Sequence, residues 1–161
     1  IKRMKSNFED LQEFHRSFEH PCPDEVDRTF FEKKSLVKLR MDLIREEVKE
    51  LEDAVSNNDF VETIDALGDI IYVVQGMAVC MGVNLQRAFE IIHESNMSKL
   101  CRTEEEAKQT VAWYIENKLD IYDSPTYKQS KDKKYYIVYN SSTGKILKNI
   151  NYTAANFSNI I

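Results

Sequence analysis

Six carboxylate side chains lie on or beside the apolar side of two nearby stretches of the sequence, "IREEVKELEDAV" and "VETIDALGDIIYVV". They belong to Glu46, Glu47 and Glu50 in the first stretch and to Glu62, Asp65 and Asp69 in the second. Oxygen ligands without His or Cys among them are typical of sites for hard divalent cations such as Mg²⁺ or Mn²⁺. Such a cation can bind substrate phosphates and activate water, so the pattern indicates phosphoryl or nucleotidyl chemistry.

The acids of the first stretch lie on or beside an apolar helix face. Residues three or four apart share a face of an α-helix, so Glu47 and Glu50 lie together, as do Glu46 and Glu50. Glu47 also interrupts an apolar stripe, because it lies four residues after Leu43 and four before Leu51. The stretch therefore predicts an amphipathic helix with carboxylates at the edge of its buried face.

The acids of the second stretch form one line that contains no basic residue. Glu62 and Asp65 are three residues apart and Asp69 follows four later, which aligns all three on one helix face. Solvated helix faces usually interleave acids with Lys or Arg, whereas the neighbours here are apolar. Buried, unpaired carboxylates are very costly unless they coordinate a metal or become protonated. We therefore expect a cation to offset the repulsion.

Two helices joined by a short turn must position these acids. Periodic apolar residues predict helices over about 33–56 and 59–81, and "SNNDF" between them predicts the turn. A short connection places two helices antiparallel and adjacent, so the two sets of acids converge. The second helix is apolar on more than one side, which predicts that it is the central and most buried helix.

The remaining pattern completes a helical core with a small appendage. One further helix is expected over about residues 6–20, and two more after the cap residues Asn84 and Thr103. "KYYIVYN" is rich in β-formers and precedes "SSTG" and "KILKNI", which predicts a β-hairpin. We predict an all-α fold, with a four-helix core over residues 6–100. A small α+β appendage (one helix, a hairpin and an irregular tail) would follow over residues 101–161.

Composition and charge narrow the class of protein. The chain has 22 basic and 27 acidic residues, a net charge of −5, which argues against a nucleic-acid or membrane-surface binder. The three cysteines are widely spaced, so neither a disulfide framework nor a zinc site is expected. The opening "IKRMKSNFEDLQEF" is charged, unlike a signal peptide, and the apolar run over residues 70–82 is shorter than the roughly 20 residues that span a bilayer. We expect a soluble, cytoplasmic protein.

These motifs resemble the all-α nucleoside triphosphate pyrophosphohydrolase superfamily, which includes MazG-like and phosphoribosyl-ATP pyrophosphohydrolase-like proteins. "EEVKE" followed by "ETID" resembles its EExxE…ExxD signature. "FHRSFEHPCPD", "DALGDIIYVVQGMAVCMGVNLQRAFEIIHESNMSKL" and the closing "GKILKNINY" are similar to the phosphoribosyl-ATP pyrophosphohydrolase-like group. The resemblance covers about residues 8–100 and 144–152. The segment over residues 103–142 is longer than in the simplest members and receives no role from it.

The resemblance implies an enzyme that converts an NTP or dNTP to the monophosphate and pyrophosphate. The implied cofactor is Mg²⁺, for which Mn²⁺ can substitute. The implied metal ligands are Glu47, Glu50, Glu62 and Asp65. The implied catalytic residues are Glu46, Glu47 and Lys99, and the implied substrate contacts are Asn96, Lys99, Asp69, Tyr72 and His15. Members of the superfamily are typically homodimers or tetramers.

The sequence leaves two functions open. An enzyme needs a cation beyond the metal to hold phosphates, and Lys99 is a candidate, although lysines are also favoured near helix C-termini for electrostatic reasons. A helical binding or regulatory module would use the same acids for a structural metal site. The substrate is also open among deoxypyrimidine triphosphates such as dUTP and dCTP and modified nucleotides.

Overall fold

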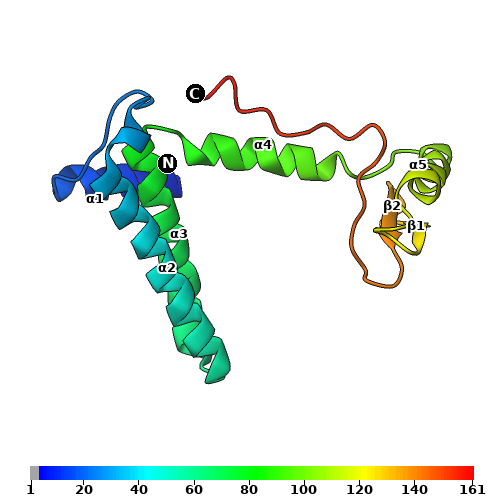
Figure 1. Cartoon of the computed structure of the whole chain (residues 1–161), viewed down its shortest axis with the longest axis horizontal. Helices are drawn as coiled ribbons and strands as arrows, with labels where there is room; N and C mark the ends of the chain where they lie inside the picture. Colours follow the sequence, from blue (N-terminus) through cyan, green and yellow to red (C-terminus); the bar gives the residue numbers. More distant parts are fainter. Residues whose placement is uncertain (1–3) are drawn as a thin grey trace. The chain divides into compact units, whose positions relative to one another are not determined.

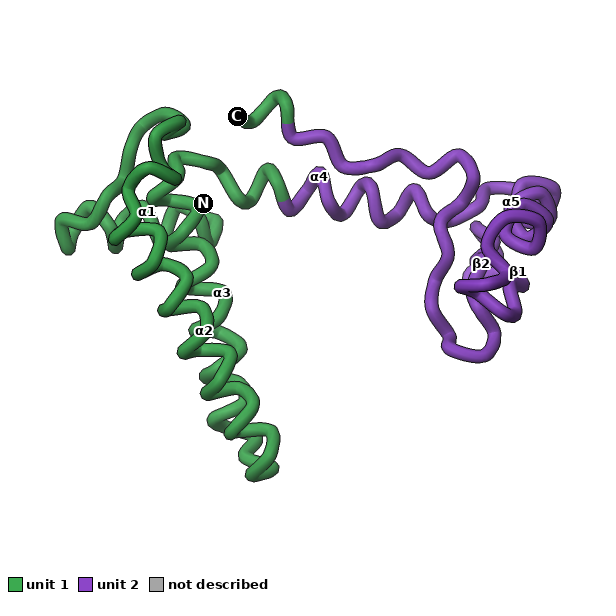
Figure 2. The backbone as a smooth tube through the Cα atoms, in the orientation of Figure 1, with its two compact units in different colours: residues 1–88, 158–161 green, residues 89–157 purple. Residues whose placement is uncertain are grey.

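The computed structural model describes residues 4–161 and divides the chain into two compact units (Figures 1 and 2). Unit 1 runs to Ala88 and includes residues 158–161, and unit 2 comprises residues 89–157. The expected fold class, a helical core followed by a small α+β appendage, is confirmed. The boundary between the two units lies inside the helix Leu85–Met97. The predicted division into a core over residues 6–100 and an appendage over residues 101–161 stays a prediction.

Unit 1 is built from three α-helices and one turn of 3₁₀-helix. They are α1 (Asn7–Ser17), η1 (Phe30–Glu32), α2 (Lys34–Ser56) and α3 (Phe60–Met81). Helix α1 begins at Ser6, whose side chain accepts a hydrogen bond from the Glu9 amide, and α3 begins at Asp59, which accepts from the Glu62 amide. Helices α2 and α3 pack against each other as an antiparallel pair (Figure 1). The short turn between them thus brings the two acidic stretches together, as expected.

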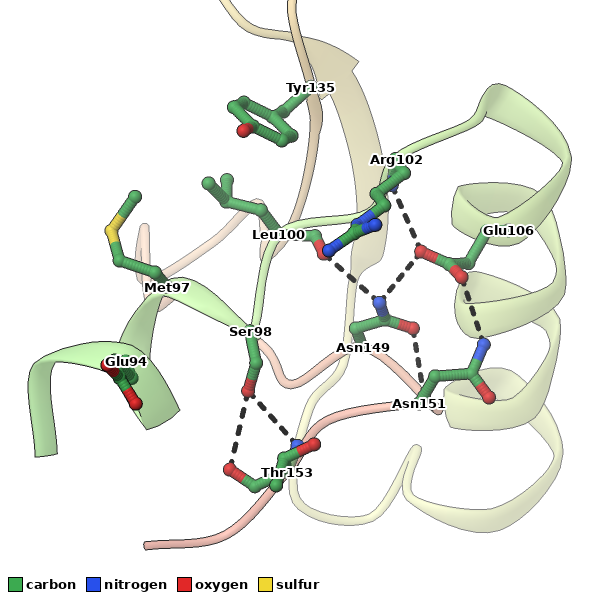
Figure 3. A pocket seen from close by; sticks show the side chains of 10 residues that line it. All are labelled: Glu94, Met97, Ser98, Leu100, Arg102, Glu106, Tyr135, Asn149, Asn151 and Thr153. Carbon is green, nitrogen blue, oxygen red and sulfur yellow. Dashed lines mark hydrogen bonds between the residues drawn. The ribbon is translucent and has the colours of Figure 1, made fainter. Parts of the chain in front are cut away.

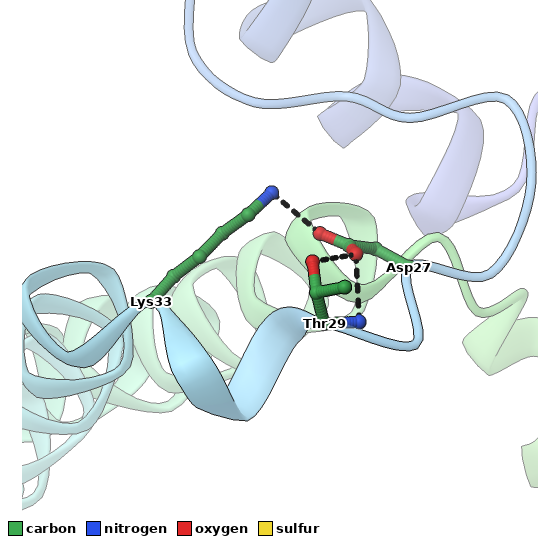
Figure 4. Close-up of polar contacts among 3 residues, drawn as sticks. All are labelled: Asp27, Thr29 and Lys33. Atoms are coloured by element: carbon green, nitrogen blue, oxygen red, sulfur yellow. Dashed lines mark hydrogen bonds and ion pairs between the residues drawn. The ribbon is translucent and has the colours of Figure 1, made fainter.

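The loop before α2 is held by one carboxylate, that of Asp27 (Figure 4). It accepts hydrogen bonds from the Thr29 amide at 2.9 Å, the Thr29 hydroxyl at 2.7 Å and the Lys33 ammonium at 2.6 Å. The bond from Lys33, followed by those from Thr29, lowers the pKa of Asp27 to about 2. The Asp27 amide in turn donates to the Met81 carbonyl at 2.9 Å. The start of α2 is therefore anchored to the end of α3.

Helix α3 packs against both α1 and α2 and has more buried residues than either, as expected of a central helix, but its apolar surface is only partly covered. Its second half contributes buried residues such as Ala78, Val79 and Cys80. Its first half instead exposes Phe60 at 81% and Ile64 at 59% of their surface. An all-round apolar pattern predicts that a helix needs cover on all sides, but it does not say which molecule supplies the cover. Within one chain, α1 and α2 cover only part of it.

The length of α3 also bears on the expectation about membranes. Among residues 4–161, α3 is the one helix long and apolar enough, by length and composition, to cross a bilayer. The expectation weighed residues 70–82 alone, whereas the helix covers 22 residues. Core helices of soluble proteins meet the same requirement, and Asp65 and Asp69 would be costly in hydrocarbon.

Unit 2 contains the rest of α4 (Leu85–Met97), α5 (Glu104–Asn117), β1 (Pro125–Gln129) and β2 (Tyr136–Asn140). The Asn84 side chain accepts from the Arg87 amide and the Thr103 hydroxyl from the Glu106 amide, so both predicted caps are confirmed. The two strands pair antiparallel, from Pro125 opposite Asn140 to Gln129 opposite Tyr136. A β-hairpin is therefore present in the appendage, as expected.

The partner of β2 differs from the prediction. "KYYIVYN" pairs with residues 125–129, which read as a polar turn, and not with "KILKNI". The latter returns only far enough for a single bridge between Ile146 and Tyr139. The turn after β2 is tight, since the buried Asn140 side chain donates to Ser142 and Thr143 and Gly144 adopts a φ of 74°. Further along the same edge of β2, the Tyr136 amide and carbonyl form hydrogen bonds with the backbone of Cys101, so a longer pairing finds no free groups there.

Each unit has its own small core, and each core includes a buried thiol. Phe8, Leu11, Ala78 and Val79 pack together in unit 1, where Cys80 is also buried. Cys101, Ala107, Tyr114, Val138 and Leu147 pack together in unit 2. Burial raises the pKa of both the Cys80 and the Cys101 thiol above the ordinary value. The three cysteines are all free, as the sequence predicts.

Candidate metal centre

Three carboxylates meet where α2 faces α3. One oxygen each from Glu47, Glu50 and Asp69 lies within 4.8 Å of the other two. Glu47 and Glu50 share a face of α2 because they are three residues apart, and the antiparallel packing brings Asp69 of α3 opposite them. We call these three residues the acidic cluster.

The acidic cluster concentrates negative charge without compensation. The Oε2 atom of Glu47 is buried and has no hydrogen-bond partner. Desolvation, followed by the negative charge of Glu50, raises the pKa of the Glu47 carboxyl. Desolvation, followed by the charge of Asp65, likewise raises the pKa of Asp69. Both shifts indicate that the ionised forms lack a positive partner.

The two basic residues of α2 that adjoin the acidic cluster in sequence, Arg45 and Lys49, form ion pairs with other acids. Lys49 pairs with Asp53 at 3.1 Å and Arg45 with Asp42 at 3.2 Å, on the exposed surface of the helix. Within residues 4–161, no ion pair reaches Glu47, Glu50 or Asp69. Helix α2 therefore has an exposed face on which acids pair with basic residues, and a partly buried face on which Glu47 and Glu50 have no basic partner.

The acidic cluster fits a hard divalent cation. It offers oxygen ligands only, from two helices, with an orphaned buried oxygen on Glu47. A cation is the ordinary way to offset carboxylates that are close together and partly buried. The donor set is that of Mg²⁺ or Mn²⁺ rather than zinc, which prefers Cys and His.

The other predicted ligands flank the acidic cluster. Asp65 lies beside Asp69, and its negative charge contributes to the raised pKa of Asp69. Glu62 lines a hollow of 270 Å³ near the α2–α3 turn, together with Glu50. Glu46 is exposed, and its charge contributes to the raised pKa of Glu47. The structure thus places Asp69, predicted as a substrate contact, among the closest three acids, with Asp65 about one turn and Glu62 about two turns before it along α3.

Two predicted substrate contacts of unit 1 differ in accessibility. Tyr72 lines a hollow of 210 Å³ between α1 and α3, and its ring meets Phe14 edge to face at 5.5 Å. His15 is buried, with Nδ1 2.8 Å from the Pro21 carbonyl, and does not line that hollow. Tyr72 is therefore placed to contact a ligand, whereas His15 closes the turn after α1. The roles of both residues stay predictions.

Asn96 and Lys99 belong to unit 2. Asn96 is exposed on α4, and its carbonyl accepts from the Lys99 amide at 3.2 Å where the helix ends. Lys99 lines a cavity with residues far away in the sequence, which include Trp113 and Lys145. The sequence did not reveal this cavity, since its residues come from four separate segments.

A larger cavity of unit 2, of 560 Å³, is lined mainly by polar side chains (Figure 3). Glu106 accepts there from Asn149 at 2.8 Å, Asn151 at 2.9 Å and the Arg102 amide at 3.0 Å. Its carboxylate is thus already surrounded by donors from the chain. This cavity therefore resembles a structural polar network more than a metal centre.

Known proteins with similar sequences point the same way as the geometry. The chain is 28% identical to an uncharacterized protein of Acanthamoeba polyphaga mimivirus, over 97% of this chain and 96% of that protein. Residues 11–96 match the family described as phosphoribosyl-ATP pyrophosphohydrolase. This segment includes α2, α3 and all three residues of the acidic cluster. The chain belongs to the phosphoribosyl-ATP pyrophosphohydrolase family, within the MazG-like all-α NTP pyrophosphohydrolase superfamily.

Proposed function

We propose that the protein hydrolyses a nucleoside triphosphate or deoxynucleoside triphosphate to the monophosphate and pyrophosphate. Family membership supports a pyrophosphohydrolase-type activity. The observation that carries the proposal is the acidic cluster, with its orphaned Glu47 oxygen, inside the segment that matches the family.

The acidic cluster would hold the cofactor, which we propose to be Mg²⁺, with Mn²⁺ as a substitute. Glu47 and Glu50 of α2 and Asp69 of α3 would be ligands, with Asp65 and Glu62 beside them. A divalent cation supplies positive charge for phosphate oxygens and lowers the pKa of water. The repulsion that raises the pKa of Glu47 and Asp69 favours such a cation over an empty site.

The other site residues have proposed roles that follow from their positions and from the family likeness. The exposed Glu46, next to Glu47, would orient the attacking water. Tyr72, in the hollow against α1, would contact the nucleoside. Asn96 and Lys99 would contact the nucleotide, where an ammonium group can offset phosphate charge. Deoxypyrimidine triphosphates such as dUTP and dCTP, and modified nucleotides, are the proposed substrates.

We further propose that the protein is a homo-oligomer, a dimer or a tetramer. The support is the apolar surface that the first half of α3 leaves exposed, which includes Phe60 and Ile64. Contiguous exposed apolar surface of this kind marks interaction sites. Light scattering coupled to size-exclusion chromatography measures the mass directly, and Ile64→Lys should lower it to that of one chain. A monomeric wild type would contradict the proposal.

Pyrophosphate release from a panel of NTPs and dNTPs, with Mg²⁺ present, tests the activity. We expect turnover of at least one nucleotide, and its loss in Glu50→Gln because a ligand is removed. Glu52→Gln is the matched control, because Glu52 is an exposed acid of the same helix outside the acidic cluster. Metal binding without turnover of any nucleotide would leave a structural metal site and reject the enzyme.

A further inference from the structure

A cavity of 460 Å³ in unit 2 gathers four lysines around aromatic rings. The lysines are Lys99, Lys118, Lys145 and Lys148, and the rings on which the inference depends are those of Trp113 and Tyr122. We call this the lysine cavity. No acidic residue lines it, although the chain as a whole has a net charge of −5.

The lysines have no anionic partners in the part of the chain that the structure describes. None of the four forms an ion pair with a carboxylate within residues 4–161. The Lys145 ammonium instead lies 3.3 Å from the Tyr122 hydroxyl, and that of Lys148 lies 4.7 Å from the centre of the Tyr152 ring. Lys118 follows the end of α5, where a cation is favoured by the helix dipole. The same explanation applies to Lys99, which follows the end of α4, but not to Lys145 and Lys148.

The backbone that carries Lys145 and Lys148 is fixed before any ligand binds. The Asn140 amide donates to the Lys145 carbonyl at 2.8 Å, and the Tyr114 hydroxyl donates to the Lys148 carbonyl at 2.9 Å. Between them, Leu147 is buried and its amide donates to Val138 at 2.9 Å. The two ammonium groups therefore extend from an ordered segment, which lowers the entropic cost of binding.

The aromatic side of the cavity adds a second kind of contact. Trp113 is 43% exposed and lies edge to face against Tyr114, with ring centroids 5.1 Å apart. An exposed indole held by a buried neighbour offers a face on which a planar base can stack. Ammonium groups beside such a face match phosphates attached to a base.

We propose that the lysine cavity binds a nucleoside polyphosphate, with the phosphates at the lysines and the base on Trp113. All four of its lysines and its tryptophan lie beyond residues 11–96, the segment that matches the family. Binding here needs no metal and does not depend on the proposed hydrolysis. The cavity volume suits a mononucleotide, which favours a nucleotide over a nucleic-acid strand.

Trp113 makes the test specific, because it is the only tryptophan in the chain. The full-length protein is titrated in EDTA with ATP, dUTP and inorganic tripolyphosphate, while tryptophan fluorescence and heat of binding are recorded. We expect ATP and dUTP to quench the fluorescence with saturation, equally in wild type and in Glu50→Gln. Loss of turnover in the nucleotide panel would leave this result unchanged, so the two proposals fail separately.

Variants separate the phosphate contact from the base contact. Lys145→Ala with Lys148→Ala should weaken both nucleotide and tripolyphosphate binding at least about tenfold. Lys131→Ala with Lys134→Ala removes the same charge from an exposed loop outside the cavity and should change neither. By calorimetry, Trp113→Leu should weaken nucleotide binding by about 5- to 100-fold and spare tripolyphosphate.

Three outcomes would overturn the proposal. The first is the absence of any saturable response to nucleotides in EDTA. The second is equal loss of affinity in the two double-lysine variants, which would indicate nonspecific attraction. The third is tight binding of single-stranded oligonucleotides without binding of mononucleotides, which would assign the cavity to nucleic acid instead.

Discussion

The acidic cluster of unit 1 and the lysine cavity of unit 2 are both places where the fold concentrates one sign of charge. They differ in what holds the charges. Glu47, Glu50 and Asp69 extend from two helices packed along their length, and their oxygens lie within 4.8 Å of one another. The four lysines have long side chains and come from three separate segments around a cavity of 460 Å³. Short side chains on rigid helices suit a small ion, whereas long side chains around a cavity suit an extended anion.

The largest expected effect is the loss of pyrophosphate release when a single acid of the acidic cluster is removed. We expect Asp69→Asn to lower metal-dependent pyrophosphate release by about 100-fold or more, because it removes a ligand atom. Asp65→Asn, one turn away, should cost less, on the order of tenfold, since Asp65 acts beside Asp69. Steady-state kinetics over a range of Mg²⁺ concentrations measures both. A larger loss of pyrophosphate release in Asp65→Asn than in Asp69→Asn would indicate that Asp65 is a metal ligand, as the family resemblance implies.

The two glycines with left-handed backbone, one in each unit, allow the stability of the units to be compared. A Cβ at Gly82 (φ 72°) would lie 2.1 Å from the Glu25 carbonyl oxygen, whereas a Cβ at Gly144 (φ 74°) meets nothing within 4 Å. Gly82→Ala should therefore lower the free energy of unfolding by about 3 kcal/mol, through strain and overlap. Gly144→Ala should lower it by about 1 kcal/mol, through backbone strain alone.

Denaturant unfolding, followed by circular dichroism, compares the two glycine variants directly. Equal effects of the two substitutions would show that the Glu25 carbonyl moves away without cost. In that case the loop before α2 is less tightly packed against the end of α3 than the hydrogen bond from Asp27 to Met81 indicates.

Ligands of opposite charge should stabilise the protein through different sites. Millimolar Mg²⁺ or Mn²⁺ should raise the melting temperature by roughly 5 °C if it reaches 100 times its Kd. Glu50→Gln should abolish this shift. Tripolyphosphate in EDTA should give a smaller rise, which persists in Glu50→Gln and disappears in Lys145→Ala with Lys148→Ala. Scanning fluorimetry of the wild type and of both variants, with each ligand, measures these shifts. An unchanged melting curve of the wild type at millimolar metal would count against a metal site at the acidic cluster.

The smallest expected effect is a pH dependence from Asp27, an acid that has its own basic partner. Its pKa is about 2 in the folded chain, against 3.8 ordinarily, because Lys33 and Thr29 donate to its carboxylate. The folded state therefore gains stability from ionised Asp27 above pH 4, and this gain is lost as the pH falls toward 2. Asp27→Asn should flatten that part of the curve of unfolding free energy against pH. An identical curve in wild type and variant would show that the contact is too exposed to matter.

Local signals in the sequence were enough to predict the helices and their ends. Ser6, Asp59, Asn84 and Thr103 each accept a hydrogen bond from the first turn of a helix, and Gly82 ends α3 in the left-handed conformation. These signals lie within a few residues of the feature that they determine. The convergence of α2 and α3 followed from the short turn between them.

Features that depend on how elements rotate against each other were not predictable in the same way. A helical period shows that Asp65 and Asp69 share a face, but only the packing of α2 on α3 decides which one lies nearest to Glu47. A longer pairing of β2 with residues 145–150 is prevented because Cys101, distant in the sequence, bridges to Tyr136 on the same edge. The lysine cavity unites residues up to 49 positions apart, from Lys99 to Lys148, without any local motif.

The alkylation rates of the buried thiols of Cys80 and Cys101 can be used to follow the opening of each unit separately. Only the thiolate reacts with an alkylating reagent, and burial both shields these sulfurs and raises their pKa. Each will be alkylated only when the surrounding core opens, so the labelling rate reports the local opening free energy of that unit. Cys22, which is less buried, reacts first and serves as an internal standard. Mass spectrometry of the labelled chain can therefore reveal whether the two units open together or one at a time.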